Sequence, residues 1–180
     1  YQDYIAGTLD AVAYNEFVAA FLSTQSMTDL HTYRDEYLKT WIRPNMRPKA
    51  IEQIAYHRTQ GDTVVVISAT NDFVVVPIAK LFEVGDEHTL ATRLEVVDDV
   101  YTGKVADKPN FKDGKLYHLK NLIHRFESQG IKFDKLIAYS DSKNDIPLLN
   151  HADEAICVTP DDTLRAYAKE QGWQVVDWAM

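Results

Sequence analysis

The sequence predicts an α/β protein in which a doubly wound parallel sheet follows a helical segment. From about residue 47 onward, apolar runs that suit buried strands alternate with amphipathic stretches that suit helices. The run Thr63–Ile67 is apolar on both faces, as in a central strand of a parallel sheet. Residues 1–46, in contrast, carry helical periodicity alone.

Two helices are predicted in the first 46 residues. The first covers Ala11–Leu22, and the second begins at Thr28, a suitable N-cap, and continues to Ile42. Prolines after residue 43 stop the second helix and mark a boundary. We expect Trp41 and the tyrosines before it to pack in the core of this helical cap segment.

The remainder, residues 47–180, is predicted to form the α/β core. It carries a β-hairpin insert at about residues 86–106, whose strands at 89–105 flank Asp98 and Asp99. The predicted strands are 63–67, 136–139, 154–158 and 174–176, and the predicted helices are 49–59, 72–82, 115–129, 144–149 and 162–170.

Composition excludes several classes of protein. A formal charge of -8 disfavours a nucleic-acid partner, which would require a basic face. The longest uncharged apolar run, Thr63–Thr70, is too short to cross a bilayer, so no membrane partner is expected. The single cysteine, Cys157, cannot form an internal disulfide and lies in an apolar run. We therefore expect a cytoplasmic protein in which Cys157 packs in the core.

The first candidate site follows the strand at 63–67. In open α/β sheets, ligands bind at the carboxyl ends of the strands. Ser68 stands there, and the backbone N–H groups of Ala69 and Thr70 lead into the next helix, which is a suitable cradle for a phosphate oxygen. A hydroxyl residue in this place also suits an ordinary helix cap, and both interpretations stay open.

Two further groups of polar residues stand at the starts of later elements. Lys115 begins a helix after Gly114, although a single lysine is usually solvated. Asp141 and Asp145 come directly after the strand at 136–139, and carboxylates crowded in this way favour a bound cation. Mg²⁺ takes one or two protein carboxylates together with water and phosphate oxygens. A solvated loop is the alternative for these residues.

Together these groups resemble a known family. Ser68, Lys115 and the pair Asp141 and Asp145 occur in the order of motifs II, III and IV of haloacid dehalogenase (HAD) superfamily phosphatases. The resemblance covers nearly the whole chain, and its opening helices resemble the cap of the phosphoserine-phosphatase-like branch. The stretches that carry the resemblance are VVVISATNDF, ATRLEVVDDVYTGKV, FKDGKLYHL, AYSDSKNDIPLL and VTPDDTLRAYAKEQGWQVVDW.

The resemblance implies a role for each matching residue. Ser68 would hydrogen-bond the transferring phosphoryl group, and Lys115 would neutralise its charge. Asp141 would ligate Mg²⁺, and Asp145 would orient Lys115 or a water molecule. Asn144 would contact phosphate or substrate. These roles suit phosphoryl transfer, which requires positioning and charge neutralisation.

One family motif has no counterpart in these 180 residues. The family carries an Asp-x-Asp-x-(Thr/Val) motif whose first aspartate becomes an aspartyl-phosphate. Gly7-Thr8-Leu9 resembles the sequence that follows this motif, but Tyr4 and Ala6 occupy the two aspartate positions. The opening Tyr1–Gly7 also suggests the end of a helix, so we expect an additional N-terminal segment that carries the nucleophile.

The predicted function is Mg²⁺-dependent hydrolysis of a small phosphorylated metabolite through an aspartyl-phosphate. Phosphoserine and histidinol phosphate are the candidate substrates that the resemblance suggests. A receiver domain of a response regulator combines similar groups, but its acidic residues precede the hydroxyl and the lysine in sequence. An inactive fragment or pseudoenzyme that serves as a binding or assembly module is the remaining alternative.

Overall fold

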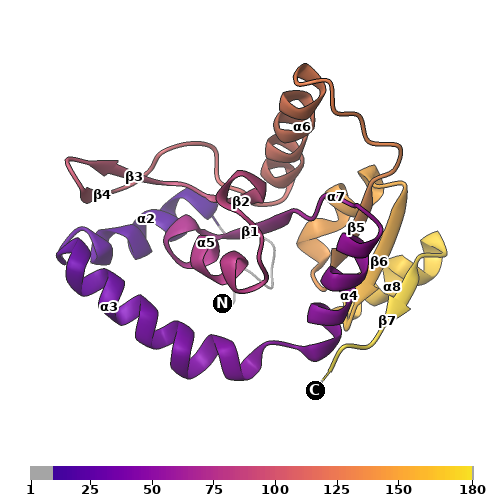
Figure 1. The fold of residues 1–180 in the computed structure, drawn as a ribbon, viewed down its shortest axis with the longest axis horizontal. Coiled ribbons are helices and arrows are strands. Elements are labelled where there is room, and N and C mark those ends of the chain that lie inside the picture. Colours follow the sequence, from indigo (N-terminus) through magenta and orange to yellow (C-terminus); the bar gives the residue numbers. More distant parts are fainter. Residues whose placement is uncertain (1–9, 180) are drawn as a thin grey trace. The chain divides into compact units, whose positions relative to one another are not determined.

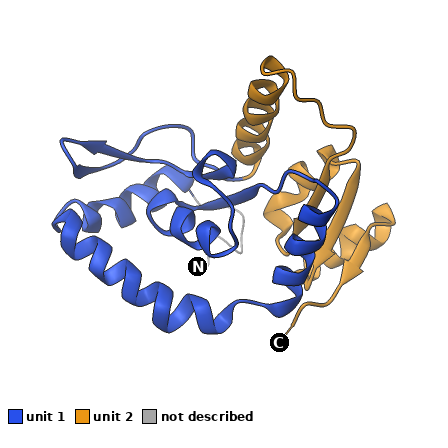
Figure 2. Ribbon diagram, in the orientation of Figure 1, with its two compact units in different colours: residues 1–111 blue, residues 112–180 orange. Residues whose placement is uncertain are grey.

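The structure, a computed structural model, describes residues 10–179 (Figure 1). The chain divides into two compact units, residues 1–111 and residues 112–180 (Figure 2). The helix end predicted at Tyr1–Gly7 lies outside the described residues. No helix within residues 10–179 combines the length and the apolar character that crossing a bilayer requires.

The first unit opens with the two predicted helices. α2 covers Ala11–Leu22 as expected, and the carboxylate of Asp10 accepts hydrogen bonds from the first-turn N–H groups. α3 starts two residues earlier than predicted, because its N-cap is Ser26, whose hydroxyl accepts a hydrogen bond from the amide of Asp29 at 3.1 Å. The predicted N-cap, Thr28, therefore lies inside the first turn. The helical elements of this unit are α2, α3 (Met27–Tyr37), a π-helical turn (Leu38–Ile42), a 3₁₀ turn (Arg43–Asn45), α4 (Pro48–Thr59), α5 (Asp72–Leu81) and a 3₁₀ turn (Asp86–His88).

The strands of the first unit form a parallel pair and a hairpin. β1 (Val66–Asn71) pairs parallel with β2 (Thr89–Thr92), and β3 (Leu94–Val97) pairs antiparallel with β4 (Val100–Val105). The strand predicted at 63–67 is displaced toward the C-terminus, because Asn71 still pairs with Thr92. The hairpin turns at Asp98 and Asp99, as predicted, but residues 89–92 belong to the parallel pair and not to the hairpin.

A small apolar core holds the first unit together. α2 packs on β4, and the buried side chains are Ala19, Leu22, Leu30, Leu94 and Tyr101. The expectation that Trp41 and the preceding tyrosines belong to this core is wrong, since Trp41 is 67% exposed and Tyr33 and Tyr37 are also exposed. From α3, Leu30 is buried in this core and Met27 packs against it.

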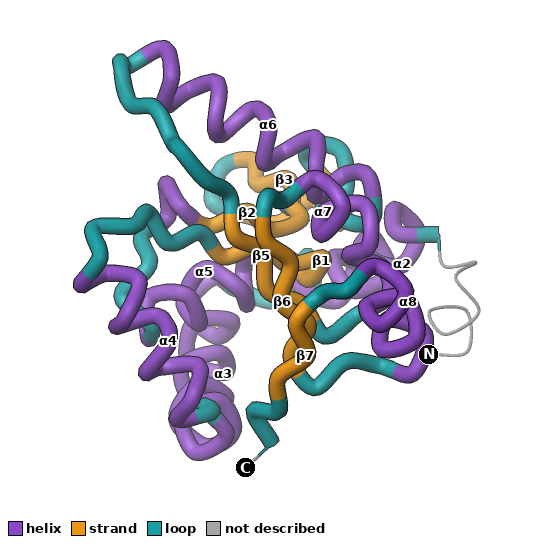
Figure 3. Tube along the Cα trace, turned by 90° about the vertical axis from the view of Figure 1, so that its right-hand side faces the viewer, coloured by secondary structure: helices purple, strands orange, loops and turns teal. Residues whose placement is uncertain are grey.

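The second unit alternates helices and parallel strands. Its strand order is β5–β6–β7, and the three strands lie side by side in Figure 3. Cys157 in the central strand is fully buried, as predicted, and burial raises the pKa of its thiol. The elements are α6 (Asp113–Ser128), β5 (Ile137–Ser140), a 3₁₀ turn (Lys143–Asp145), α7 (Ile146–His151), β6 (Glu154–Val158), α8 (Asp162–Gln171) and β7 (Gln174–Val176).

The parallel pairings and the intervening helices confirm the predicted α/β class. The division into a cap segment at 1–46 and a core at 47–180 stays a prediction, because the compact units divide after Phe111. Among the described strands, β1 pairs only with β2, and β5 pairs only with β6. Each of these two strands therefore keeps one edge without a described neighbour.

Candidate active site

Ser68 lies inside β1, four residues before α5 begins at Asp72. Its hydroxyl oxygen accepts a hydrogen bond from the Thr70 amide at 3.2 Å, and its side chain is half-buried. The N-cap of α5 is Asn71, whose Oδ1 accepts from the Val74 amide at 3.3 Å. Because Asn71 caps the helix, the alternative in which Ser68 is an ordinary helix cap is wrong.

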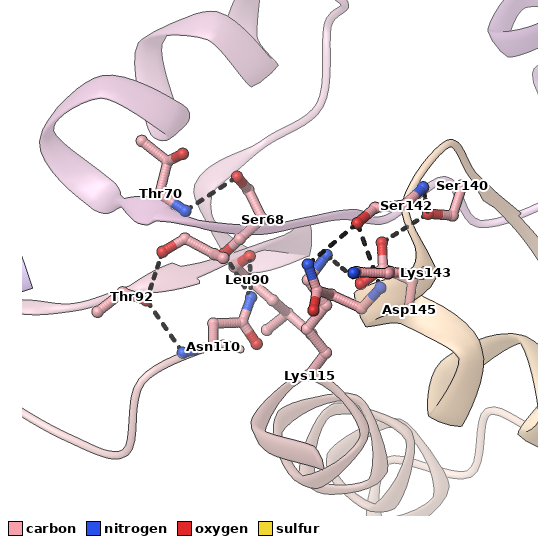
Figure 4. Close-up of polar contacts among 12 residues, drawn as sticks. Ser68, Thr70, Leu90, Thr92, Asn110, Lys115, Ser140, Ser142, Lys143 and Asp145 are labelled. Carbon is pink, nitrogen blue, oxygen red and sulfur yellow. Dashed lines mark hydrogen bonds and ion pairs between the residues drawn. The ribbon is translucent and has the colours of Figure 1, made fainter. Parts of the chain in front are cut away.

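Lys115 and Asp145 form the centre of the candidate site in the second unit (Figure 4). Lys115 lies in the first turn of α6, and its Nζ is 2.6 Å from Oδ1 of Asp145. The Ser140 hydroxyl, at the end of β5, donates to Oδ2 of the same carboxylate at 2.6 Å. Both charged side chains are at most 10% exposed. The last residue of β5 therefore helps to hold the carboxylate that receives the lysine.

The loop between β5 and α7 is held by a residue of another element. Asp161, the N-cap of α8, accepts a hydrogen bond from the Lys143 amide at 2.7 Å, and its own amide donates to the Asp141 carbonyl at 2.9 Å. Asn144 is buried, and its amide and its Nδ2 both donate to the Ser142 hydroxyl. The backbone of this loop therefore has defined partners within the second unit.

The Asp141 carboxylate differs from that of Asp145. Asp141 is exposed at the carboxyl end of β5, and its carboxylate makes no hydrogen bond or ion pair with a described residue. The described side chains contain no group of three histidine, cysteine or acidic residues that could hold a metal ion. A single carboxylate still fits Mg²⁺, which completes its coordination with water and phosphate oxygens.

The predicted site residues thus fall into two groups. Ser68, Ala69 and Thr70 lie in the first unit, whereas the second unit brings the other four together on one loop and one helix start: Lys115, Asp141, Asn144 and Asp145. The meeting of these two groups around one phosphate stays a prediction.

Comparison with known proteins identifies the family. A family model described as haloacid dehalogenase-like hydrolase matches residues 2–150. The chain belongs to the haloacid dehalogenase-like hydrolases. A histidinol-phosphatase of Neisseria meningitidis is 35% identical over 99% of this chain and 80% of its own length. The phosphoserine phosphatase SerB1 of Mycobacterium tuberculosis is 29% identical over 94% of this chain. The chain spans about half of that relative's length (53%).

A solved structure agrees with this haloacid dehalogenase-like assignment. A Bordetella pertussis protein of unknown function superposes with a TM-score of 0.89 at 33% identity, over 99% of this chain and 79% of its own. The two named relatives are both phosphatases, so the chain lies in the phosphoserine-phosphatase-like branch, as the sequence motifs indicated.

Several residues of the haloacid dehalogenase-like site were not identified from the sequence. Ser140 holds Asp145, and Asp161 holds the Asp141 loop. In the first unit, Thr92 and Asn110 contact the backbone around Ser68. Thr92 and Asn110 are fully buried, but in sequence a threonine at a strand end and an asparagine after a proline suggest only a turn.

Proposed function

We propose that this chain is the larger part of a Mg²⁺-dependent phosphatase that hydrolyses a small phosphate monoester. In this proposal an aspartyl-phosphate forms on a nucleophile that lies outside these 180 residues. The observation that carries the proposal is the buried Lys115–Asp145 ion pair, together with the exposed Asp141 on the loop that leads to Asp145. The carboxylate holds the ammonium in a defined position, and a lysine ammonium can donate charge-assisted hydrogen bonds to phosphate oxygens.

Different residues of the chain would each have a distinct part in binding the phosphate group. The Ser68 hydroxyl and the nearby backbone N–H groups would hydrogen-bond the phosphoryl oxygens, since the segment leads into the N-terminus of α5. Lys115 would neutralise negative charge on the transferring group, and Asp145 would keep the ammonium oriented. Asn144 would contact phosphate or substrate once its side chain turned from Ser142.

Asp141 is the residue that would hold Mg²⁺. Its side chain is exposed, and its backbone carbonyl accepts a hydrogen bond from the amide of Asp161. The carboxylate would therefore be accessible to the ion while its backbone is held in place. When bound, the ion would supply positive charge beside the phosphate.

The proposal that the nucleophile lies elsewhere is supported by two features. The sequence contains no two aspartates separated by one residue, so no stretch of it can supply the family's first motif. The described part of the chain also leaves one edge of β1 and one edge of β5 without a neighbouring strand. Such edges can accept a further strand through backbone hydrogen bonds.

Histidinol phosphate and phosphoserine are the substrates proposed for first testing. The support comes from the two relatives, of which the histidinol-phosphatase has the higher identity and is matched over more of its length. The exposed aromatic residues of α3, Tyr33 and Tyr37, are candidates for contacts with the organic part of the substrate.

The test is phosphate release by the full-length protein from a panel of monoesters, with and without Mg²⁺. We expect hydrolysis that EDTA abolishes and added Mg²⁺ restores. Lys115→Ala should lower kcat about 100-fold or more, because it removes the charge that stabilises the transition state. Asp141→Asn should raise the Mg²⁺ concentration needed for half-maximal activity. Lys120→Ala, exposed on the same helix, and Asp162→Asn are the matched controls.

Two outcomes would contradict the proposal. A wild-type value of kcat in Lys115→Ala would show that the ion pair has no part in hydrolysis. The absence of hydrolysis across the panel would favour a binding or assembly module. The 180-residue chain assayed alone should release no phosphate. Turnover by that chain would contradict the external nucleophile.

A further inference from the structure

We infer that Asn110 and Thr92 are positioning residues that hold the backbone of Ser68 and Ala69 in the conformation required for phosphate binding. The functional part of this inference rests on the proposed function. The structural part depends only on contacts within the first unit, where both residues are fully buried.

The starting observation is an irregularity in the pairing of β1 with β2. Ile67 pairs with Leu90, and Asn71 pairs with Thr92. Between these two pairs, β1 advances four residues while β2 advances two. The two extra residues of β1 fall in the segment around Ser68 and Ala69. A bulge of this kind interrupts the ladder, so backbone groups within it need other partners.

Two side chains supply those partners (Figure 4). Nδ2 of Asn110 donates to the Ser68 carbonyl at 2.8 Å and to the Leu90 carbonyl at 2.6 Å. The Thr92 hydroxyl donates to the Ala69 carbonyl at 2.9 Å and accepts from the Asn110 amide at 3.0 Å. Two consecutive carbonyls of the bulge are thus held by one connected pair of residues.

This arrangement fixes two peptide planes. In a trans peptide, the carbonyl of one residue and the N–H of the next point in opposite directions. With the carbonyls of Ser68 and Ala69 directed at Asn110 and Thr92, the N–H groups of Ala69 and Thr70 must point to the opposite side. The Thr70 N–H does so, since it donates to the Ser68 hydroxyl oxygen. The hydroxyl and these amides are the groups proposed to bind phosphate.

Filling space in the interior does not by itself explain Asn110. Its Oδ1 is buried and accepts no hydrogen bond from any residue that the structure describes. Burying a carbonyl oxygen without a hydrogen bond lowers stability, so an apolar residue would fill the same space at lower cost. Its two N–H donors at the bulge are what an apolar side chain of similar size could not provide.

The test compares four variants of the full-length protein. Thr92→Val removes the hydroxyl with little change in volume, and Thr92→Ser restores it. Asn110→Asp replaces the donors with a carboxylate oxygen. Asn15→Asp is the matched control, because Asn15 is also buried and its Nδ2 donates to a backbone carbonyl, that of Ala11 in α2.

Two measurements are made on each variant: hydrogen exchange of the amides of residues 69 and 70, and kcat and KM for the best monoester substrate. We expect Thr92→Val and Asn110→Asp to speed exchange at those amides. Both should also lower kcat by about 10- to 100-fold with a smaller change in KM, since misplaced catalytic groups lower kcat. Thr92→Ser should recover most of the loss, and Asn15→Asp should change neither measurement.

The outcomes separate this inference from the proposed function. Unchanged exchange in Thr92→Val would overturn the inference whatever the activity, as would an equal kcat loss in Asn15→Asp at equal stability. If the wild type hydrolyses no monoester, the proposed function fails, and exchange alone decides whether Asn110 and Thr92 hold the bulge. If Asn110→Asp does not fold, the Thr92→Val and Thr92→Ser pair still decides.

Discussion

Lys115 and Asp145 show how the second unit can hold two charges away from solvent. Removing an ammonium and a carboxylate from water is costly, and their attraction offsets the cost only with good geometry. Here Nζ and Oδ1 are 2.6 Å apart, and the Ser140 hydroxyl satisfies Oδ2. Among the described residues, Oδ1 faces only the ammonium. The pair is therefore sensitive to the loss of either member.

Lys115→Met should destabilise the protein by about 3 kcal/mol, because it leaves the Asp145 carboxylate buried without its cation. The measurement is the free energy of unfolding in urea at neutral pH. The exposed neighbour Lys120→Met is the control and should change stability by less than about 0.5 kcal/mol. Equal stability of the two variants would show that the ion pair is not maintained in solution.

Helix α8 is connected to the candidate site through its N-cap. Asp161 accepts from the Leu164 amide at 2.8 Å, which caps the helix, and from the Lys143 amide, which belongs to the Asp141 loop. One carboxylate therefore satisfies donors from two elements that are separate in sequence. The stability of α8 and the conformation of the loop should change together.

Asp161→Ala should lower the free energy of unfolding by about 1 to 2 kcal/mol through the lost cap. It should also speed hydrogen exchange of the Lys143 amide, which loses its acceptor. Asp161→Asn keeps an acceptor oxygen and should lose less. The neighbouring Asp162→Ala is the control, since Asp162 lies in the first turn but does not cap the helix. Protection of the Lys143 amide in Asp161→Ala would contradict the proposed link.

For the molecule as a whole, the dependence of stability on pH has an identifiable contribution from the core of the first unit. Burial, together with the negative charge of Asp72, raises the pKa of Tyr101 to about 12. Burial also raises the pKa of Asp72 itself. In the unfolded chain the Tyr101 hydroxyl ionises near its ordinary value of 10.0. The native state therefore binds the tyrosine proton more tightly than the unfolded state does.

This difference predicts a loss of stability in alkali. Below pH 10 the contribution of Tyr101 is fully present, and it is lost as the pH rises from 10 to about 12, because ionisation favours the unfolded state. At pH 11 the loss should be about 1 kcal/mol, and Tyr101→Phe should lack it. Urea unfolding at pH 8 and pH 11 measures the effect. Tyr14→Phe, whose side chain is exposed, should retain the wild-type dependence, and an identical dependence in both variants would contradict the assignment.

Elements whose signals are local could be predicted from the sequence. The predicted strands at 154–158 and 174–176 and the helix Ala11–Leu22 agree with the structure residue for residue. The apolar runs and helical periodicity behind these predictions act within a few residues of the chain. The order of Ser68, Lys115 and the pair Asp141 and Asp145 likewise indicated the family, because each motif is a short continuous stretch of sequence.

Other features depend on residues that are distant in sequence, so they could be recognised only in the folded chain. The displacement of β1 follows from its pairing with β2, and the carbonyls freed by its bulge find donors on Thr92 and Asn110. Nothing local distinguishes buried Asn110 from a solvated asparagine, just as nothing local shows that Trp41 is exposed. Burial and hydrogen-bond partners are properties of the folded chain, so the surroundings of these residues could not be predicted from the sequence.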